Sequence, residues 1–445
     1  MLKVYEEHPE FDQYSQFDTG TGRLSTLSAQ DFHSLLPVGA HKSGQLLDRI
    51  ETDRATIYWG ATPSTHTRFP RRIYFQITRN CNLGCDYCFI RAERGAPHVP
   101  TDAILKLART MGENGLMEVR LTGGEPTVHP DFFSIMHYFK NEGVYVSIAT
   151  NGMWSQRTLE RLCQEPALWV ICSVDGGREV HNRFRPRTFD KIITNLRYLR
   201  EHNPSARIRL TAVLTRHNRD QMFELGKVGV SVGAESITVI PLRPQVRNPD
   251  VVKDMVTAAE FKHVIEDLIA VKEKLGIPFT TTMETQYKAL VYRDPIVRKR
   301  SSCAAGREAT NLDYNAATRQ FQVYACSYSP ASDLTANSAL RAPFLAGQFA
   351  AEDPSALAGI WQDEGAWTIY RDLSIRSHTC QGCIFLKHNQ CTGSCPIQNI
   401  DYDAINASQD VLDQLREQIV RTGEWYCYQH ILGSDVEGKD TDARP

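Results

Sequence analysis

The stretch that decides the fold is RIYFQITRNCNLGCDYCF, residues 72–89, in which a strand-like run leads directly into three cysteines. Cys81, Cys85 and Cys88 follow one another at spacings of four and three residues. Thiols grouped this closely form disulfides, bind zinc or hold an iron–sulfur cluster. The composition and the motifs of the rest of the chain distinguish between these three kinds of site.

The bulk properties describe an ordinary globular chain of 445 residues, long enough for two or three domains. The formal net charge of −2 gives no basic surface field that would attract nucleic acid. The mean hydropathy of −0.37 is ordinary for a globular protein. We find no apolar run long enough to span a bilayer and no secretory signal in MLKVYEEHPEF. We therefore expect a cytoplasmic protein that binds neither membrane nor nucleic acid.

Twelve cysteines are many for such a chain. Cytosolic thiols are kept reduced, which disfavours a disulfide framework and favours metal binding by clustered thiolates. A second group lies near the C-terminus, and we interpret Cys163 and Cys172 as packing residues, because free cysteine behaves as a small buried hydrophobe. The second group consists of Cys303, Cys326, Cys380, Cys383, Cys391, Cys395 and Cys427.

Residues 1–70 are predicted to form a small N-terminal α+β domain. YSQFDTGTGRLSTLS, residues 14–28, predicts a hairpin that turns at Asp18-Thr19-Gly20, and AQDFHSLL, residues 29–36, predicts a helix. For residues 43–60 we expect a helix followed by a strand. The polar, proline-ended segment ATPSTHTRFP predicts a linker to the next domain.

Residues 71–295 alternate strand and helix patterns. Thr257 and Glu260 predict a capping box, which opens a helix whose apolar stripe contains Phe261, Val264, Ile265 and Leu268. Repeated strand–helix units predict a parallel α/β sheet curled into a partial (β/α)6 barrel of the TIM type, with an open doubly wound sheet as the alternative. The expected strands are 72–78, 117–123, 145–151, 169–175, 207–215 and 236–242.

Residues 296–445 lose this regular alternation. Cysteine, glycine and short polar segments dominate, which is typical of a region organised by metal rather than by a large apolar core. We expect a cysteine-rich, metal-organised domain here.

Three cysteines without a fourth Cys or His nearby suit a [4Fe–4S] cluster with one iron left open. The C-x3-C-x2-C spacing, with Tyr87 before the last cysteine, resembles the radical S-adenosylmethionine (SAM) superfamily. GGEP at 123–126, TNG at 150–152 and SVDG at 173–176 end the next three strands in the order found in that superfamily. The resemblance implies SAM contacts by Gly123, Gly124, Glu125, Ser173, Asp175 and Arg185. A zinc site or a purely electron-carrying cluster is the alternative.

The C-terminal cysteines resemble the SPASM extension of peptide and protein maturases. That resemblance implies two auxiliary [4Fe–4S] clusters. One is held by Cys303, Cys326 and Cys395 with no evident fourth ligand, and the other by Cys380, Cys383, Cys391 and Cys427. Two features depart from the family pattern: seven residues separate Cys383 from Cys391, and Phe321 stands where the family has glycine. A pair of structural zinc sites is the alternative, because zinc and iron–sulfur clusters share thiolate ligands.

By the same resemblance, the reduced cluster cleaves SAM to a 5′-deoxyadenosyl radical, which abstracts hydrogen from a substrate that is then oxidised. A flavodoxin- or ferredoxin-type protein is the implied electron donor. We expect modification of a ribosomally made peptide, and the N-terminal domain loosely resembles leader-peptide-binding modules that add a strand, with a plain barrel cap as the alternative.

Three other functions stay open at this point. They are dehydrogenation or epimerisation of a sugar or cyclitol, sulfatase-type protein maturation and non-enzymatic electron transfer. The sulfatase-activating enzymes have an aspartate after the second SPASM cysteine, where this chain has Ser327. No catalytic base is identified, although Glu284, Tyr287 and Asp313 are candidates.

Overall fold

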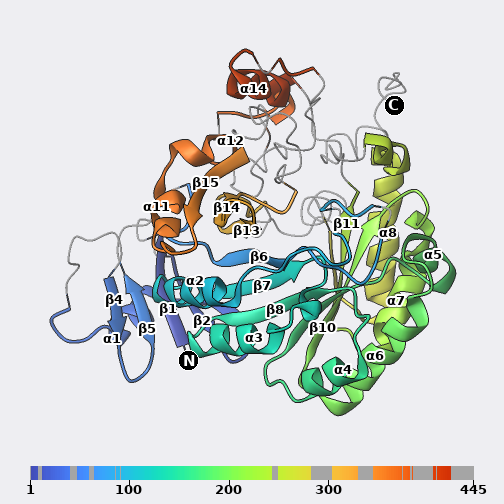
Figure 1. Ribbon diagram of the computed structural model, residues 1–445, viewed down its shortest axis with the longest axis horizontal. Helices are drawn as coiled ribbons and strands as arrows, with labels where there is room; N and C mark the ends of the chain where they lie inside the picture. The colour runs from blue at the N-terminus through green and yellow to red at the C-terminus, as the bar shows by residue number, and fades with distance from the viewer. Residues whose placement is uncertain are drawn as a thin grey trace.

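The computed structural model describes residues 2–8, 13–40, 48–59, 65–85, 87–90, 92–242, 249–281, 303–328, 344–372, 374–380, 383, 404–406 and 408–421. These residues form a small five-stranded sheet and a large ten-stranded sheet (Figure 1). In the described part of the chain, no helix is both long and apolar enough to cross a membrane.

The small sheet contains the N-terminal residues, in the strand order β3-β2-β1-β5-β4. The predicted hairpin and helix are confirmed, and the turn closes with a hydrogen bond from the Gly22 amide to the Asp18 carbonyl at 2.7 Å. The helix expected after residue 43 is wrong for residues 48–51, which pair as a strand with β5. The elements are β1 (Leu2–His8), β2 (Gln13–Asp18), β3 (Arg23–Leu27), α1 (Ala29–Leu35), β4 (Asp48–Glu51) and β5 (Thr56–Trp59).

The large sheet begins with seven parallel strands in the order of the chain, which confirms the predicted parallel α/β architecture. Each of the six expected strands is present to within two residues, and a short seventh follows the last helix. The strands are β6 (Arg72–Thr78), β7 (Glu118–Gly123), β8 (Tyr145–Thr150), β9 (Trp169–Ser173), β10 (Arg207–Leu214), β11 (Ser236–Pro241) and β12 (Phe279–Thr281).

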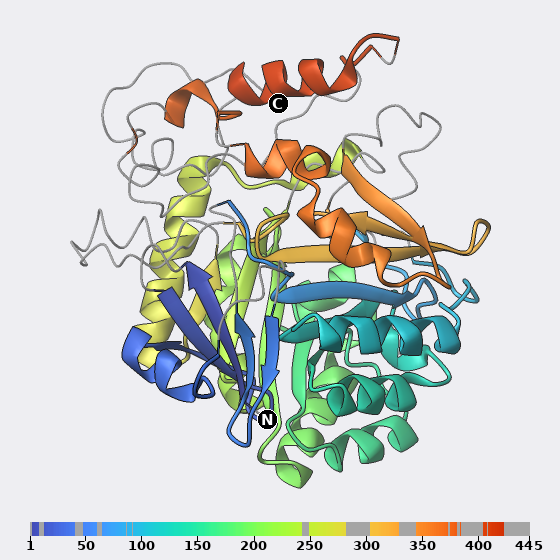
Figure 2. The ribbon, with the colours of Figure 1, turned by 90° about the vertical axis from the view of Figure 1, so that its left-hand side faces the viewer.

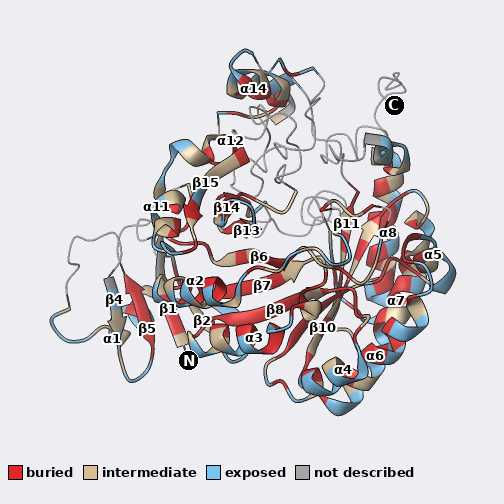
Figure 3. Cartoon of the chain, in the orientation of Figure 1, coloured by how far each residue is buried: buried red, intermediate tan, exposed pale blue. Residues whose placement is uncertain are grey.

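Helices connect these strands and cover one face of the sheet, with their apolar sides inward and their polar sides exposed (Figure 3). The longest, α8, begins with the predicted capping box of Thr257 and Glu260 and ends at Gly276, whose φ of 70° suits glycine. The helices are α2 (Thr101–Glu113), η2 (Pro126–Val128), α3 (Phe132–Asn141), α4 (Gln156–Cys163), α5 (Arg178–Phe184), α6 (Phe189–His202), η3 (Arg219–Gln221), α7 (Met222–Ser231), η4 (Pro249–Asp254) and α8 (Ala258–Leu275).

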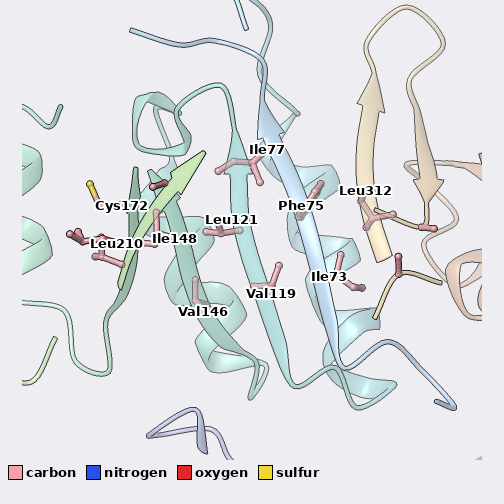
Figure 4. Packing of buried hydrophobic residues seen from close by; sticks show 14 of the residues in the cluster. Ile73, Phe75, Ile77, Val119, Leu121, Val146, Ile148, Cys172, Leu210 and Leu312 are labelled. Carbon is pink, nitrogen blue, oxygen red and sulfur yellow. The ribbon is translucent and has the colours of Figure 1, made fainter. Parts of the chain in front are cut away.

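Alternation along each strand separates a packing face from an interior face. Ile73, Phe75 and Ile77 on β6, like Val119 and Leu121 on β7, belong to the buried cluster under the helices (Figure 4). The intervening residues therefore face the inside of the curved sheet, where the substrate site of such a fold is built.

Three further strands, which the sequence does not predict, extend the sheet beyond β6 in the region where the regular strand–helix alternation stops. Strand β13 pairs in parallel with β6, and β14 and β15 continue the sheet in antiparallel fashion. In Figures 1 and 2 they lie above β6. The region contains β13 (Ala309–Asn315), β14 (Gln320–Tyr324), β15 (Leu345–Ala350), α11 (Ala356–Gln362), η6 (Gly365–Trp367), α12 (Thr368–Arg371), η7 (His378–Cys380) and α14 (Val411–Arg421).

The N-terminal sheet covers the end of the large sheet at which its strands begin (Figure 1). Lys3 Nζ donates to the Leu116 carbonyl at 3.0 Å and Tyr5 Oη to the Gly115 carbonyl at 2.9 Å, just before β7. Phe17 packs with Tyr145 and Trp169, which begin β8 and β9. This end of the interior is therefore closed, which leaves the carboxyl ends of the strands for a site.

Candidate functional site

The three cysteines of the first cluster lie directly after β6 and line a cavity of about 240 Å³ at the carboxyl ends of the parallel strands. Cys81 is buried, and Cys85 and Cys88 are partly exposed. The Cys88 amide donates to the Cys85 carbonyl at 3.1 Å, which folds the loop back on itself. All three thiols therefore border one cavity.

The cavity also brings together residues predicted from distant parts of the sequence. Gly123 and Gly124 line it from the end of β7, Ser173 from the end of β9, and Arg185 from the residue after α5. Active sites of curved parallel α/β sheets gather at this edge because the strand ends converge there. The other lining residues on the strands or at their ends are Gln76, Thr122, Ala149, Thr150, Asn151, Thr211, Val213, Ile240 and Leu242.

The two glycines are required by the cysteine loop. A Cβ on Gly123 would lie 2.1 Å from the Thr78 carbonyl oxygen, and one on Gly124 would lie 2.2 Å from that of Asn80. The amides of Gly124 and Glu125 donate to these same carbonyls, each at 2.9 Å. The end of β7 thus holds the start of the cysteine loop through backbone contacts that no side chain would permit.

Glu125, predicted as an acceptor for SAM, is fully buried beside the cavity and does not line it. Its Oε1 accepts from the Thr127 hydroxyl at 2.6 Å and its Oε2 from the Asn151 amide at 2.7 Å. Burial raises the pKa of the carboxyl, although these hydrogen bonds oppose the shift. In this structure Glu125 joins the ends of β7 and β8, and its contact with SAM stays a prediction.

Asp175 is likewise fully buried and lies behind the cavity wall rather than on it. Its Oδ2 accepts from Arg185 Nε at 2.8 Å and from Tyr87 Oη, and its Oδ1 accepts from the Val213 amide at 3.1 Å. Burial by itself raises the pKa of Asp175, but the Arg185 charge and these hydrogen bonds outweigh it and hold the pKa below its usual value. The carboxylate therefore positions Arg185 and Tyr87.

Arg185 connects this buried network to the cysteine loop. Its Nη1 lies 3.7 Å from Cys85 Sγ, while its Nε donates to Asp175. The guanidinium is fixed at the cavity wall with its charge beside the thiols, a position suited to binding an anionic group. Its pairing with a SAM carboxylate stays a prediction.

The donor set fits an iron–sulfur cluster better than a single metal ion. A structural zinc site needs four ligands at about 2.3 Å from sulfur to metal, which forces the ligands together. Among the described residues, no three His, Cys, Asp or Glu side chains converge closely enough to surround one ion. A [4Fe–4S] cluster binds each thiolate to a different iron, and the three thiols that line this cavity suit three of its four irons.

The second cysteine group is described only in part. Cys326 follows β14 and is partly buried, Cys303 is exposed, and the Cys383 amide donates to the Cys380 carbonyl at 3.1 Å. Cys391, Cys395 and Cys427 lie outside the described residues.

The two remaining cysteines pack as expected. Cys172 is fully buried in the core under the helices, and Cys163 is partly buried against the same core.

Among the three candidate bases, Asp313 on β13 is buried and does not line the cavity. Its Oδ2 accepts from Arg79 Nη2 at 2.7 Å, an ion pair that joins β13 to the residue after β6. Asp313 is therefore engaged in an ion pair with Arg79 and does not face the space in which a substrate would bind. Glu284 and Tyr287 lie outside the described residues.

The lining residues that the sequence prediction missed include Gln76, Ser327 and Tyr328. Ser327 Oγ donates to Asn311 Oδ1 at 2.9 Å, and the Tyr328 ring packs on Phe89 with centroids 4.7 Å apart. Gln76 could have been found from its place on the polar face of β6, between Phe75 and Ile77. The other two depend on the pairing of β13 with β6, which no local pattern indicated.

The comparisons with known proteins agree with this geometry. Residues 75–227 match the family described as the Radical SAM superfamily. The chain is 26% identical over 227 residues to the AdoMet-dependent heme synthase of Methanosarcina barkeri, a match that spans 50% of this chain and 64% of that protein. It is 24% identical over 330 residues to the mycofactocin maturase MftC of Mycobacterium tuberculosis, which spans 73% and 78%.

Among solved structures, SuiB of Streptococcus suis bound to S-adenosylmethionine shares the fold with a TM-score of 0.59 and 19% identity, over 75% of this chain and 74% of that one. SuiB has also been solved bound to its precursor peptide SuiA. The predicted resemblance to radical SAM enzymes of the peptide-maturase type is confirmed.

Proposed function

Because this chain is a radical SAM enzyme, we propose that it oxidatively modifies a ribosomally made peptide by hydrogen abstraction. The observation that carries the proposal is the single cavity that three thiols, two backbone-packed glycines, Ser173 and Arg185 share at the strand ends. Similarity to MftC over 73% of the chain supports a peptide as the substrate.

Each part of the cavity has a distinct task in this proposal. Cys81, Cys85 and Cys88 hold a [4Fe–4S] cluster, which when bound supplies the chemistry of reductive SAM cleavage. Arg185, fixed by Asp175, holds the carboxylate of SAM by a charge-assisted hydrogen bond. Val213, Ile240 and Leu242 give the opposite wall an apolar surface that excludes water from the reacting carbon.

The C-terminal cysteines are proposed to hold two auxiliary [4Fe–4S] clusters, one bound by Cys303, Cys326 and Cys395 and the other by Cys380, Cys383, Cys391 and Cys427. Cys326 directly precedes Ser327 and Tyr328, which line the cavity. A cluster bound there would lie beside the substrate and could accept the electron that the oxidation releases. A flavodoxin- or ferredoxin-type donor is proposed to reduce the first cluster.

The N-terminal residues 1–70 are proposed to cap the barrel. Their hydrogen bonds to the residues before β7 and the packing of Phe17 support this role. Strand β3 is an edge of the small sheet and exposes Leu24, so it also offers a place for strand addition by a peptide.

The test is anaerobic incubation of the reconstituted enzyme with SAM, dithionite and the short peptides encoded beside its gene. We expect 5′-deoxyadenosine release that rises with one of these peptides and a loss of two mass units from that peptide. Cys85→Ala should abolish release, whereas Cys163→Ala, a thiol on α4 that does not line the cavity, should leave it unchanged. Equal release by wild type and Cys85→Ala would refute the assignment of the cluster.

A second candidate function is oxidation of a small molecule, which the similarity to the heme synthase favours. The same assay separates the two. Release that no neighbouring peptide stimulates, but that a sugar, cyclitol or porphyrin does, would replace the peptide proposal by the small-molecule one.

A further inference from the structure

Gln76 presents an unpaired carboxamide to the cavity. It lies on β6, lines the cavity and is only 3% exposed. In the part of the chain that the structure describes, neither its Nε2 nor its Oε1 has a hydrogen-bond partner. Burying an amide without a hydrogen-bond partner is unfavourable in proteins, so Gln76 lowers the stability of the free enzyme.

Packing does not account for a glutamine at this position. Ile73, Phe75 and Ile77 on the same strand fill the core under the helices, whereas Gln76 points to the opposite face. Its register partner on β7 is Thr122, which also lines the cavity. An apolar side chain of the same length would fill this space without leaving two polar atoms unsatisfied.

Gln76 is not among the residues assigned to SAM, although it lies near them. Those assignments fall at the end of β7, at the end of β9 and on Arg185. Gln76 lies on β6 beside Thr122, the residue before Gly123, and shares the cavity with Ser327 and Tyr328, which follow the auxiliary residue Cys326. None of the SAM assignments uses the Gln76 carboxamide, which leaves it available for a substrate.

We propose that Gln76 determines substrate specificity by pairing its carboxamide with one peptide group of the substrate. Its Nε2 donates to a substrate carbonyl, and its Oε1 accepts from a substrate amide N–H. A carboxamide carries one donor and one acceptor in a plane and so matches both halves of a peptide group. This inference rests on the proposed peptide substrate.

The experiment compares Gln76→Met with the matched variant Gln322→Met. Gln322 on β14 is also a buried glutamine, 2% exposed, but its Oε1 accepts from Tyr324 Oη at 3.2 Å and it does not line the cavity. Four quantities are measured for wild type and both variants: the thermal midpoint without ligand, the Kd for SAM, the peptide-independent release of 5′-deoxyadenosine, and the KM for the peptide that stimulates the wild type.

For Gln76→Met we expect a thermal midpoint at or above that of wild type and an unchanged Kd for SAM. The KM for the peptide should rise about 10- to 100-fold, the range for losing hydrogen bonds to buried groups. Gln322→Met should show the reverse, with a lower thermal midpoint, an unchanged KM and an unchanged peptide-independent release.

Three results would overturn the inference. A fall in the thermal midpoint of Gln76→Met to match Gln322→Met would make Gln76 structural. A weaker Kd for SAM with an unchanged peptide KM would assign the carboxamide to the cofactor. If no peptide stimulates the wild type and it oxidises a small molecule instead, the proposed function is wrong, and the proposed pairing with a peptide group is wrong with it. Loss of that small-molecule activity in Gln76→Met would then still place Gln76 at the substrate.

Discussion

Replacement of Asp175 by asparagine is the substitution that tests the buried network most directly. The side chain of Asp175 is fully buried, and its carboxylate is the ion-pair partner of Arg185, whose side chain is 10% exposed. Asparagine has nearly the same shape, so the substitution removes the negative charge without opening a cavity. The Arg185 charge then lies buried without compensation.

Breaking a buried ion pair in this way costs about 3–5 kcal/mol of the free energy of unfolding, because the remaining charge has lost its water and its partner. The matched control is Asp190→Asn. Asp190 also pairs with an arginine, Arg178, at 2.5 Å, but the two side chains are 60% and 66% exposed. Exposed pairs contribute only about 0–1 kcal/mol, so the control should be close to wild type.

The assay is urea unfolding of the metal-free protein at several pH values, followed by tryptophan fluorescence. The pKa of Asp175 is lower in the folded protein than the unfolded value of about 3.9, so its stabilisation is complete above that value and is lost as pH falls through the folded pKa. The difference in the free energy of unfolding between wild type and Asp175→Asn should therefore be constant from pH 7 to pH 5. Equal unfolding free energies for Asp175→Asn and Asp190→Asn would refute the reasoning.

Two further predictions concern the backbone contact and the histidine beside this network. Gly124→Ala should lower the free energy of unfolding by about 1–3 kcal/mol and abolish SAM cleavage, because its Cβ would meet the Asn80 carbonyl; Gly359→Ala, which meets nothing within 4 Å, should do neither. Burial lowers the pKa of His181 to about 4, and its Nδ1 accepts from the Asp175 amide at 3.2 Å. Because the unfolded chain takes up this proton near pH 6.5, stability should fall by up to about 3 kcal/mol as pH drops from 6.5 to 4. Urea unfolding of wild type and His181→Asn across this range measures the effect, and an identical pH slope in both would contradict it.

The sequence by itself determined the parallel α/β architecture, and it predicts the chemistry of the cysteine loop. Both the architecture and this chemistry are indicated by patterns of residues that are close together in the sequence. Strands such as 72–78 alternate apolar and polar residues, a capping box marks the start of the helix at Ala258, and three cysteines within eight residues leave few kinds of ligand possible. Such signals need no knowledge of the rest of the fold, because the interacting groups are neighbours in the chain.

Only the tertiary structure decided which of the predicted site residues line the cavity and which lie behind its wall. The sequence predicts that Gly123 and Gly124 contact SAM, and the structure shows in addition that they pack against the carbonyls of Thr78 and Asn80, more than forty residues earlier in the chain. Asp175 lies behind the wall, and Gln76 on it, because strand register and the pairing of β13 with β6 set which side chains reach the cavity. These contacts depend on residues distant in sequence, so their consequences appear only once the chain has folded.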